Sequence, residues 1–201
     1  MARTREGRGA AWMAGLLLGI VALVPGRAFG AEPAKPAAPA PPAEDAVLIN
    51  GVEDDASIAK FSPTEGCTVE LSDAWQTEGK KSLKVTVEGG KGYLMAINGK
   101  NGGALPGSPK KPLDWSPYKA FKFDVYNPGA SAVELRIQVK SGDYRGVMPP
   151  VKLAAGAKQE AVCDLTKDAA LKLESIGQVN FIPKGTGKVV LHFDNFRLVK
   201  K

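Results

Sequence analysis

Strict alternation of apolar and polar residues between positions 121 and 126 is the feature that most constrains this chain. Three apolar side chains fall on one side of an extended strand: Phe121, Phe123 and Val125. Three polar side chains fall on the other side: Lys122, Asp124 and Tyr126. Because one side is apolar, a second layer must cover it. The pattern predicts a half-buried strand of a sandwich, whose polar face is open to solvent or a ligand.

The same alternation recurs along the chain. Residues 132–140 alternate and continue, after the Ser141-Gly142 turn, into residues 143–147, which predicts a hairpin. Further short strands are expected at residues 47–49, 68–71, 82–87, 93–97, 151–153, 159–165, 176–182 and 189–199. Roughly ten short strands between turns predict an all-β sandwich or barrel. Residues 167–173 form the one helical turn expected in this region.

The first 46 residues do not share this pattern. Residues 1–30 combine early arginines, an uncharged apolar run and small residues at 28–30, which predicts a cleaved signal peptide and export to the periplasm or the cell exterior. The apolar run is shorter than the ~20 residues that span a bilayer, although an uncleaved anchor is the alternative. Residues 31–46 are rich in proline and alanine and are expected to form an extended linker. Residues 47–201 then form one domain.

Charge and cysteine content limit the function classes. The net charge of +6 includes four arginines and one glutamate in residues 1–30, so removing that segment leaves about +3. So mild an excess is poor evidence for nucleic-acid binding. Cys67 and Cys163 are the two cysteines, and the sequence leaves open a disulfide or two buried free thiols.

Five short motifs follow one another along residues 47–201. They are Glu53-Asp54-Asp55, Gly79–Val85, Asp114–Tyr118, Phe123–Asn127 and His192–Leu198. In this order they resemble carbohydrate-binding modules of the galactose-binding-like jelly-roll type. The resemblance implies a jelly-roll β-sandwich that binds a polysaccharide or other glycan without catalysis. Because this fold also serves proteins that bind no sugar, the alternative is a structural or assembly domain that binds a protein partner in the cell envelope.

A sugar site needs convergent polar groups beside an aromatic ring. The outward positions of the strands at 121–126 and 132–140 supply such groups, namely Asp124, Tyr126, Arg136 and Gln138. The resemblance adds four further residues to this face: Tyr93, Tyr144, Arg145 and Asn180. The alternative is a polar sheet face that meets only water.

The resemblance also implies a structural calcium ion. In such modules an early carboxylate, carbonyl groups of a turn and an aspartate of the last strand hold a hard cation. The matching residues are Glu53 or Asp55, the turn at 78–80, and Asp194. The alternative is that these acidic residues make ordinary turn contacts.

Evidence for catalysis is thin, so an enzyme is not expected. His192 is the single histidine, and its place inside the last strand is typical of a sheet-face residue rather than a general base. No Gly-x-Ser-x-Gly motif or metal-binding histidine cluster occurs. Trp115 is expected to plug one end of the sandwich. Trp75 is either a lid or an exposed sugar platform, and the loop at 99–112 could close over a ligand.

Overall fold

The computed structural model describes residues 44–89, 92–98, 113–185 and 187–201. The chain divides into residues 1–41 and residues 42–201, and only the second unit contains described residues. The predicted signal peptide, most of the predicted linker and the loop at 99–112 therefore lie outside the described residues. No helix within the described ranges is both long enough and apolar enough to cross a membrane.

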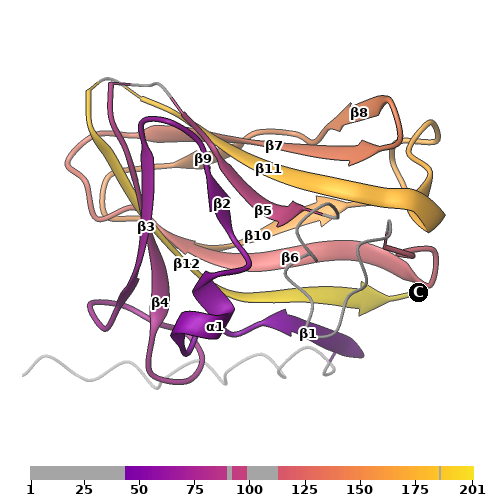
Figure 1. Ribbon diagram of the computed structural model, residues 1–201, viewed down its shortest axis with the longest axis horizontal. Helices are drawn as coiled ribbons and strands as arrows, with labels where there is room; N and C mark the ends of the chain where they lie inside the picture. Colours follow the sequence, from indigo (N-terminus) through magenta and orange to yellow (C-terminus); the bar gives the residue numbers. More distant parts are fainter. Residues whose placement is uncertain (1–43, 90–91, 99–112, 186) are drawn as a thin grey trace, which may run out of the picture. The chain divides into compact units, whose positions relative to one another are not determined.

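The described residues form two antiparallel sheets that pack face to face (Figure 1). Sheet A has the order β10 (Lys158–Asp164), β6 (Tyr118–Tyr126), β12 (Val189–Lys200), β4 (Ser82–Val87) and β3 (Cys67–Ser72), with β1 (Ala46–Asn50) also paired to β12. Sheet B has the order β2 (Ser62–Pro63), β5 (Leu94–Asn98), β11 (Ile176–Lys184), β7 (Val133–Ser141) and β8 (Tyr144–Val147), with β9 (Val151–Leu153) also paired to β7. The all-β sandwich and the β7–β8 hairpin predicted from the sequence are confirmed.

The prediction of a helical turn at residues 167–173 is only partly right. These residues form irregular turns, and a 3-10 helix begins at their last residue, spanning Leu173–Ser175. A four-residue helix, α1, at Asp55–Ile58 was not predicted from the sequence. The side chain of Asp54 starts α1 by accepting a hydrogen bond from the backbone N–H of Ser57 at 2.7 Å. A helix of one turn is too short to show a 3.6-residue periodicity, so the missed signal was the cap.

Five phenylalanine rings join the two sheets. They are Phe121 and Phe123 from β6, Phe193 and Phe196 from β12, and Phe181 from β11. The ring centroid of Phe181 lies 4.7 Å from that of Phe123 and 5.1 Å from that of Phe193. The apolar side of the strand at 121–126 is therefore buried between the layers, as predicted, and Trp115 extends the cluster by packing 5.4 Å from Phe121.

A β-bulge in β12 keeps its phenylalanines in the core. The register between β12 and β6 shifts between Asp194 and Arg197, and Asn195 adopts the left-handed conformation with φ of 51°. The extra residue lets Phe193 and Phe196 both face inward. Asp194 and Arg197 consequently both face outward, on the outer face of sheet A.

The two cysteines are buried free thiols. Cys67 lies in β3 and Cys163 in β10, which are opposite edges of sheet A. Four strand spacings separate them, about 19 Å, whereas a disulfide requires Cα atoms closer than about 7 Å. Burial raises the pKa of Cys67 to about 11 and that of Cys163 to about 12, so both thiols stay protonated.

Candidate functional site

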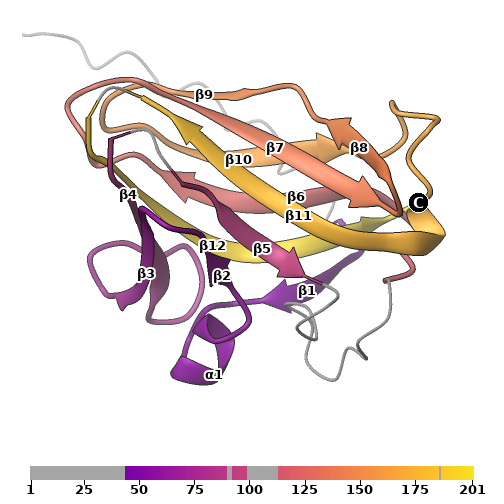
Figure 2. The same ribbon diagram turned by 45° about the horizontal axis from the view of Figure 1, so that its top comes forward.

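The expectation that the outward residues of 121–126 and 132–140 form one surface is wrong. Strand β6 belongs to sheet A and β7 to sheet B (Figures 1 and 2), so Asp124 and Tyr126 face away from Arg136 and Gln138. The segment between β6 and β7 crosses from one layer to the other. Alternation reveals which residues of a strand face outward, but it does not reveal to which layer the strand belongs.

The loop between β3 and β4 covers the outer face of sheet A. Trp75 of this loop is only 7% exposed, and its ring centroid lies 5.6 Å from that of Tyr126 and 6.5 Å from that of His192. The Nζ atom of Lys158 lies 5.0 Å from the Tyr126 ring centroid. Trp75 is therefore a lid over the outer face of this sheet rather than an exposed platform, and Tyr126 is enclosed.

Two aspartates on neighbouring strands fasten this loop to sheet A. Asp194 is fully buried, and its Oδ2 atom accepts hydrogen bonds from the backbone N–H groups of Thr77 at 2.7 Å and Glu78 at 3.0 Å. Its Oδ1 atom accepts one from the N–H of Asn195 at 2.7 Å. Asp124 lies directly opposite Asp194, is 13% exposed, and accepts from the Thr77 hydroxyl at 2.6 Å. The carboxylate of Asp124 is thus engaged within the protein.

The remaining charges on the outer face of sheet A are also paired. Arg197 contacts Asp124 at 3.5 Å and also Glu160. Lys122 contacts Glu160 at 3.2 Å and also Glu44, a residue that the sequence analysis assigned to the linker. Burial pulls the pKa of Lys122 down, but hydrogen bonds to Glu44 and Glu160 outweigh burial and raise it. These charges are therefore neutralised within the protein.

His192 is a packed residue of the same face. Its Nδ1 atom lies 3.3 Å from the hydroxyl oxygen of Ser82, and the side chain is almost fully buried. Burial, together with the nearby charge of Lys84, lowers its pKa, so the ring is neutral at pH 7. Its neighbours Trp75 and Tyr126 shield it from a substrate.

Glu53 and Asp194 both contact the turn at residues 77–80. Their carboxylates accept hydrogen bonds from its backbone N–H groups. Both carboxylate oxygens of Glu53 accept from the N–H of Lys80, at 3.1 and 2.9 Å, and a Cβ at Gly79 would lie 1.8 Å from Glu53 Oε1. Asp55 is the first residue of α1. Within the described part of the chain, no three His, Cys, Asp or Glu residues gather in a way that could hold a metal. Because these carboxylate oxygens face amide donors, the arrangement does not fit calcium, which requires six to eight oxygen ligands. Calcium stays an untested prediction.

The outer face of sheet B carries a ladder of amide side chains. In the strand register, Gln138 of β7 lies opposite Asn180 of β11 on one side and Val147 of β8 on the other. Gln178 donates from Nε2 to the Oδ1 atom of Asn180 at 2.6 Å, and Asn180 donates from Nδ2 to the Oε1 atom of Gln138 at 3.1 Å. No described residue accepts from the Nε2 group of Gln138. Val147 beside it is 64% exposed.

The other predicted sugar-binding residues surround this ladder. The side chain of Arg136 is 54% exposed and bonds Glu134 at 2.7 Å, and Arg145 of β8 lies opposite Lys140. Tyr93 is half-buried at the start of β5. The Tyr144 hydroxyl donates to the Asp168 carboxylate at 2.9 Å, at the border of the sheet. The outer face of sheet B therefore brings together Arg136, Gln138, Arg145 and Asn180. Asp124 and Tyr126 lie on sheet A, and Tyr144 pairs with the buried Ser141, so it takes an inward position at the edge of β8.

Outward residues of sheet B that were missed include Gln178, Val147, Lys152, Ile182 and Lys184. Alternation within each strand could have found them once the strands were assigned to one sheet.

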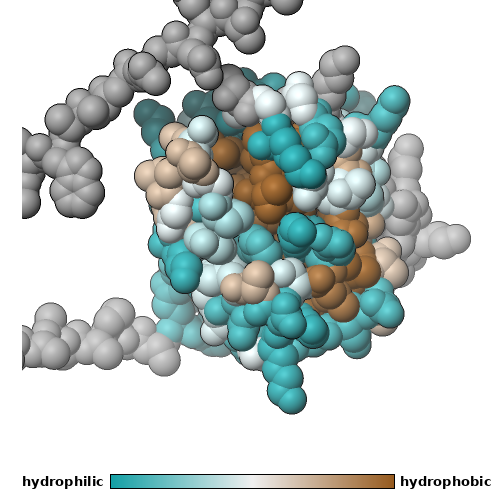
Figure 3. Space-filling model, turned by 90° about the vertical axis from the view of Figure 1, so that its left-hand side faces the viewer, coloured by the Kyte–Doolittle hydropathy of each residue, from teal (hydrophilic) through white to brown (hydrophobic). Residues whose placement is uncertain are grey.

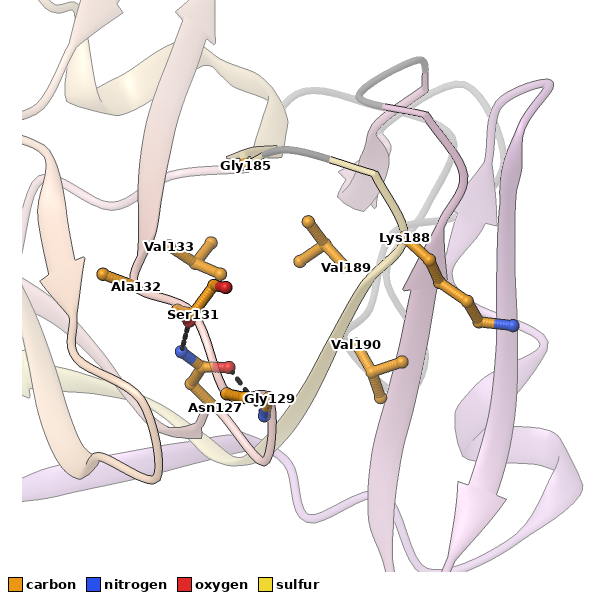
Figure 4. Close-up of a pocket in the computed structure, with 10 residues that line it drawn as sticks. Asn127, Gly129, Ser131, Ala132, Val133, Gly185, Lys188, Val189 and Val190 are labelled. Atoms are coloured by element: carbon orange, nitrogen blue, oxygen red, sulfur yellow. Dashed lines mark hydrogen bonds between the residues drawn. The ribbon is translucent and has the colours of Figure 1, made fainter. Parts of the chain in front are cut away.

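Two hollows elsewhere on the domain are weaker candidates. A pocket of about 90 Å³ lies near Asn127, Val133 and Val189 (Figure 4), at the end of the domain where Figure 3 shows a hydrophobic strip between hydrophilic residues. Small-molecule sites usually enclose about 300–1,000 Å³, so this pocket is too small. A hollow of about 330 Å³ beside Lys122 and Val162 is large enough, but Lys122 is already neutralised there.

Comparison with known proteins shows the fold. No family model and no curated protein matches the sequence. Among solved structures, the family 11 carbohydrate-binding module from Clostridium thermocellum, in complex with a β-1,3-1,4-mixed-linked tetrasaccharide, matches with a TM-score of 0.53 and 15% identity over 77% of this chain and 95% of the module. The family 22 xylan-binding domain from Paenibacillus barcinonensis matches with a TM-score of 0.51 and 13% identity over 81% of this chain and 99% of that domain.

An enzyme also matches, over part of its length. An exo-β-agarase aligns with a TM-score of 0.60 and 13% identity over 77% of this chain, but this chain spans only 25% of the agarase. The two carbohydrate-binding modules are thus matched over nearly their whole length, and the agarase over a quarter of its length. The resemblance noted in the sequence is confirmed for the fold: this chain forms the jelly-roll β-sandwich of family 11 and family 22 carbohydrate-binding modules.

Proposed function

We propose that this protein binds a polysaccharide non-covalently on the outer face of sheet B. The observation that carries the proposal is the difference in cover between the two faces. The side chain of Asp124 on sheet A is 13% exposed and fully engaged, whereas Arg145 on sheet B is exposed and forms no ion pair with a described residue. A binding face must offer polar groups that the protein has not already used.

The outer face of sheet B offers the chemistry that a sugar requires. The Nε2 group of Gln138, from which no described residue accepts, and the guanidinium of Arg145 are donors for hydroxyl oxygens. Tyr93 and the exposed Val147 provide apolar surface for the C–H face of a sugar ring. Arg145 and Val147 are exposed on the edge strand β8, whereas Asn180 in the middle of this face is 4% exposed.

The fold supports binding in general but does not identify the sugar. The first module described above is in complex with a mixed-linked glucan fragment. The second is named a xylan-binding domain. At 13–15% identity these ligands do not transfer to this chain. The signal-like residues 1–30 support export, which would place the protein where cell-wall or extracellular polysaccharides occur.

Affinity electrophoresis through gels that contain polysaccharides tests this proposal. The protein without residues 1–30 is run through a panel of neutral and acidic polymers. We expect retardation by at least one polymer, lost in Gln138→Ala and Tyr93→Ala and kept in Thr68→Ala, which alters an exposed residue on the outer face of sheet A. If no polymer retards the protein, or if only Thr68→Ala abolishes retardation, the proposal is wrong. Stable capture of one protein partner without polysaccharide binding would favour an assembly domain.

A further inference from the structure

We infer that the polysaccharide bound by sheet B is anionic, carrying carboxylate or sulfate groups. The inference rests on the function proposed above and adds the chemical class of the ligand. It comes from the distribution of charge over the two outer faces.

The outer face of sheet B is strongly cationic. The strand register places five cations at its outward positions, at Arg136, Lys140, Arg145, Lys152 and Lys184. It places one carboxylate there, that of Glu134, which lies opposite both Lys152 and Lys184. We call these six residues the cationic face. Its formal charge is about +4, larger than the charge of about +3 expected for the whole chain without residues 1–30.

Most cations of this face form no ion pair with a described residue. Glu134 forms an ion pair with Arg136 at 2.7 Å, and this is the one ion pair between described residues of the cationic face. Lys140 of β7 lies directly opposite Arg145 of β8. Like charges in directly opposed positions destabilise a sheet. The fold therefore tolerates a repulsion here that an anion between the two side chains would relieve.

On the outer face of sheet A, by contrast, cations are paired with carboxylates. Lys122 and Arg197 share Glu160, and Lys84 lies 2.6 Å from Glu70. Lys158 lies over the Tyr126 ring. Since both faces belong to one small domain, overall composition does not explain why the cations of sheet B lack carboxylates.

The spacing of the cationic face suits a polymer rather than a single anion. Arg136 and Lys140 are four residues apart along β7, about 13 Å, while Lys140 and Arg145 are about 5 Å apart across the strands. Between them lie the amides of Gln138 and Asn180 and the exposed Val147. Guanidinium groups bind carboxylate or sulfate oxygens in pairs, and the Nε2 group of Gln138, from which no described residue accepts, suits a hydroxyl group. The order along the face is therefore cation, neutral polar group, cation.

Matched pairs of polymers test the charge requirement. Polygalacturonate is compared with its methyl ester, and carrageenan with agarose, by titration calorimetry. At about 50 mM salt, where the Debye length is roughly 14 Å, we expect at least one acidic polymer to bind about tenfold or more tightly than its neutral counterpart. At about 500 mM salt, where that length falls to roughly 4 Å, the preference should shrink about tenfold. The two pairs separate carboxylate from sulfate recognition.

Two double variants, each of which removes two positive charges, test which sheet binds the acidic polymer. Lys140→Ala with Arg145→Ala should lower the affinity for the acidic polymer about tenfold, as expected for the loss of one charge-assisted hydrogen bond. Lys119→Ala with Lys158→Ala removes two exposed cations from sheet A and should leave the affinity unchanged. The first variant should not lower the Tm, because it removes a repulsion, and this confirms that it folds.

Three results overturn the inference in distinguishable ways. Equal affinity for the acidic and the neutral polymer contradicts the anionic ligand but keeps polysaccharide binding. Equal affinity for polyglutamate contradicts it too, because charge alone would then be recognised. Failure of every polysaccharide to bind contradicts the proposed function as well.

Discussion

The outer faces of the two sheets arise from the same alternating pattern, yet their polar groups are in opposite states. On sheet A, the loop that carries Trp75 and Thr77 crosses the strands, and the carboxylates of Asp124 and Asp194 are consumed in holding it. On sheet B, the described residues leave Arg145 and Lys140 without carboxylate partners. Alternation therefore predicts that a strand has a polar face. The loops decide whether the groups on that face bond the protein's own chain or stay available to a ligand.

The largest expected effect is a loss of stability when the buried carboxylate of Asp194 on sheet A is removed. Asp194→Ala leaves the N–H groups of Thr77, Glu78 and Asn195 without the buried carboxylate that accepts from them. We expect the free energy of unfolding to fall by about 3 kcal/mol, measured by urea denaturation. Polysaccharide affinity under native conditions should not change.

Asp194→Asn is the matched control, because its amide keeps one oxygen acceptor in the same shape. The free energy of unfolding should fall less in Asp194→Asn than in Asp194→Ala. If Asp194→Ala retains full stability but loses polysaccharide binding, the assignment of the two faces is reversed.

Truncating the lid should have the next largest effect. Trp75→Ala removes the ring that covers Tyr126 and His192 and should cost about 2 kcal/mol of unfolding free energy. The matched change on sheet B, Val147→Ala, alters a 64% exposed side chain and should cost under about 0.5 kcal/mol. A larger loss at Val147 than at Trp75 would show that sheet B, not sheet A, is the covered face.

Acid should weaken sheet A through its histidine. Burial and Lys84 lower the pKa of His192 in the folded chain from its usual value of 6.5. Above about pH 6.5 the ring is neutral in both states and adds no pH dependence. As the pH falls through 6.5, the unfolded chain gains a proton that the folded chain does not, so the free energy of unfolding decreases until the folded pKa is passed.

Urea denaturation between about pH 7.5 and 5.5 measures this effect, and His192→Gln should flatten the curve. A His192→Gln variant that keeps the full pH dependence would show that other groups cause it.

The smallest expected effect concerns the turn held by Glu53 and Asp194. Because both carboxylates already accept hydrogen bonds from backbone N–H groups, we expect a chelator to leave the Tm unchanged. A fall in Tm that added calcium restores would instead establish the calcium site predicted from the sequence. Magnesium serves as the control ion, since it prefers a smaller octahedral site.

Much of the fold could be predicted from local patterns. The alternation around Phe123 identified the strand and its buried side, and Ser141-Gly142 identified the hairpin. The bulge at Asn195 could not be read in advance, since it shows only as two inward phenylalanines three residues apart.

The candidate site was harder to predict, because its residues depend on long-range pairing. Asp124 and Arg136 look alike in sequence, as outward charges on neighbouring strands. Their difference lies in the contact of Thr77 with Asp124, across 47 residues of chain. The cationic face likewise appears only when β7, β8, β9 and β11 are aligned in one sheet.

Amide chemical-shift mapping tests the central claim most directly. An isotope-labelled sample is titrated with an oligosaccharide fragment of the polymer that binds in the electrophoresis assay. We predict that the largest shifts fall on β7, β8 and β11, around Gln138, Arg145 and Asn180, while β6 and β10 stay unchanged. Shifts centred on Asp124 and Glu160 of sheet A, with sheet B unaffected, would contradict the account.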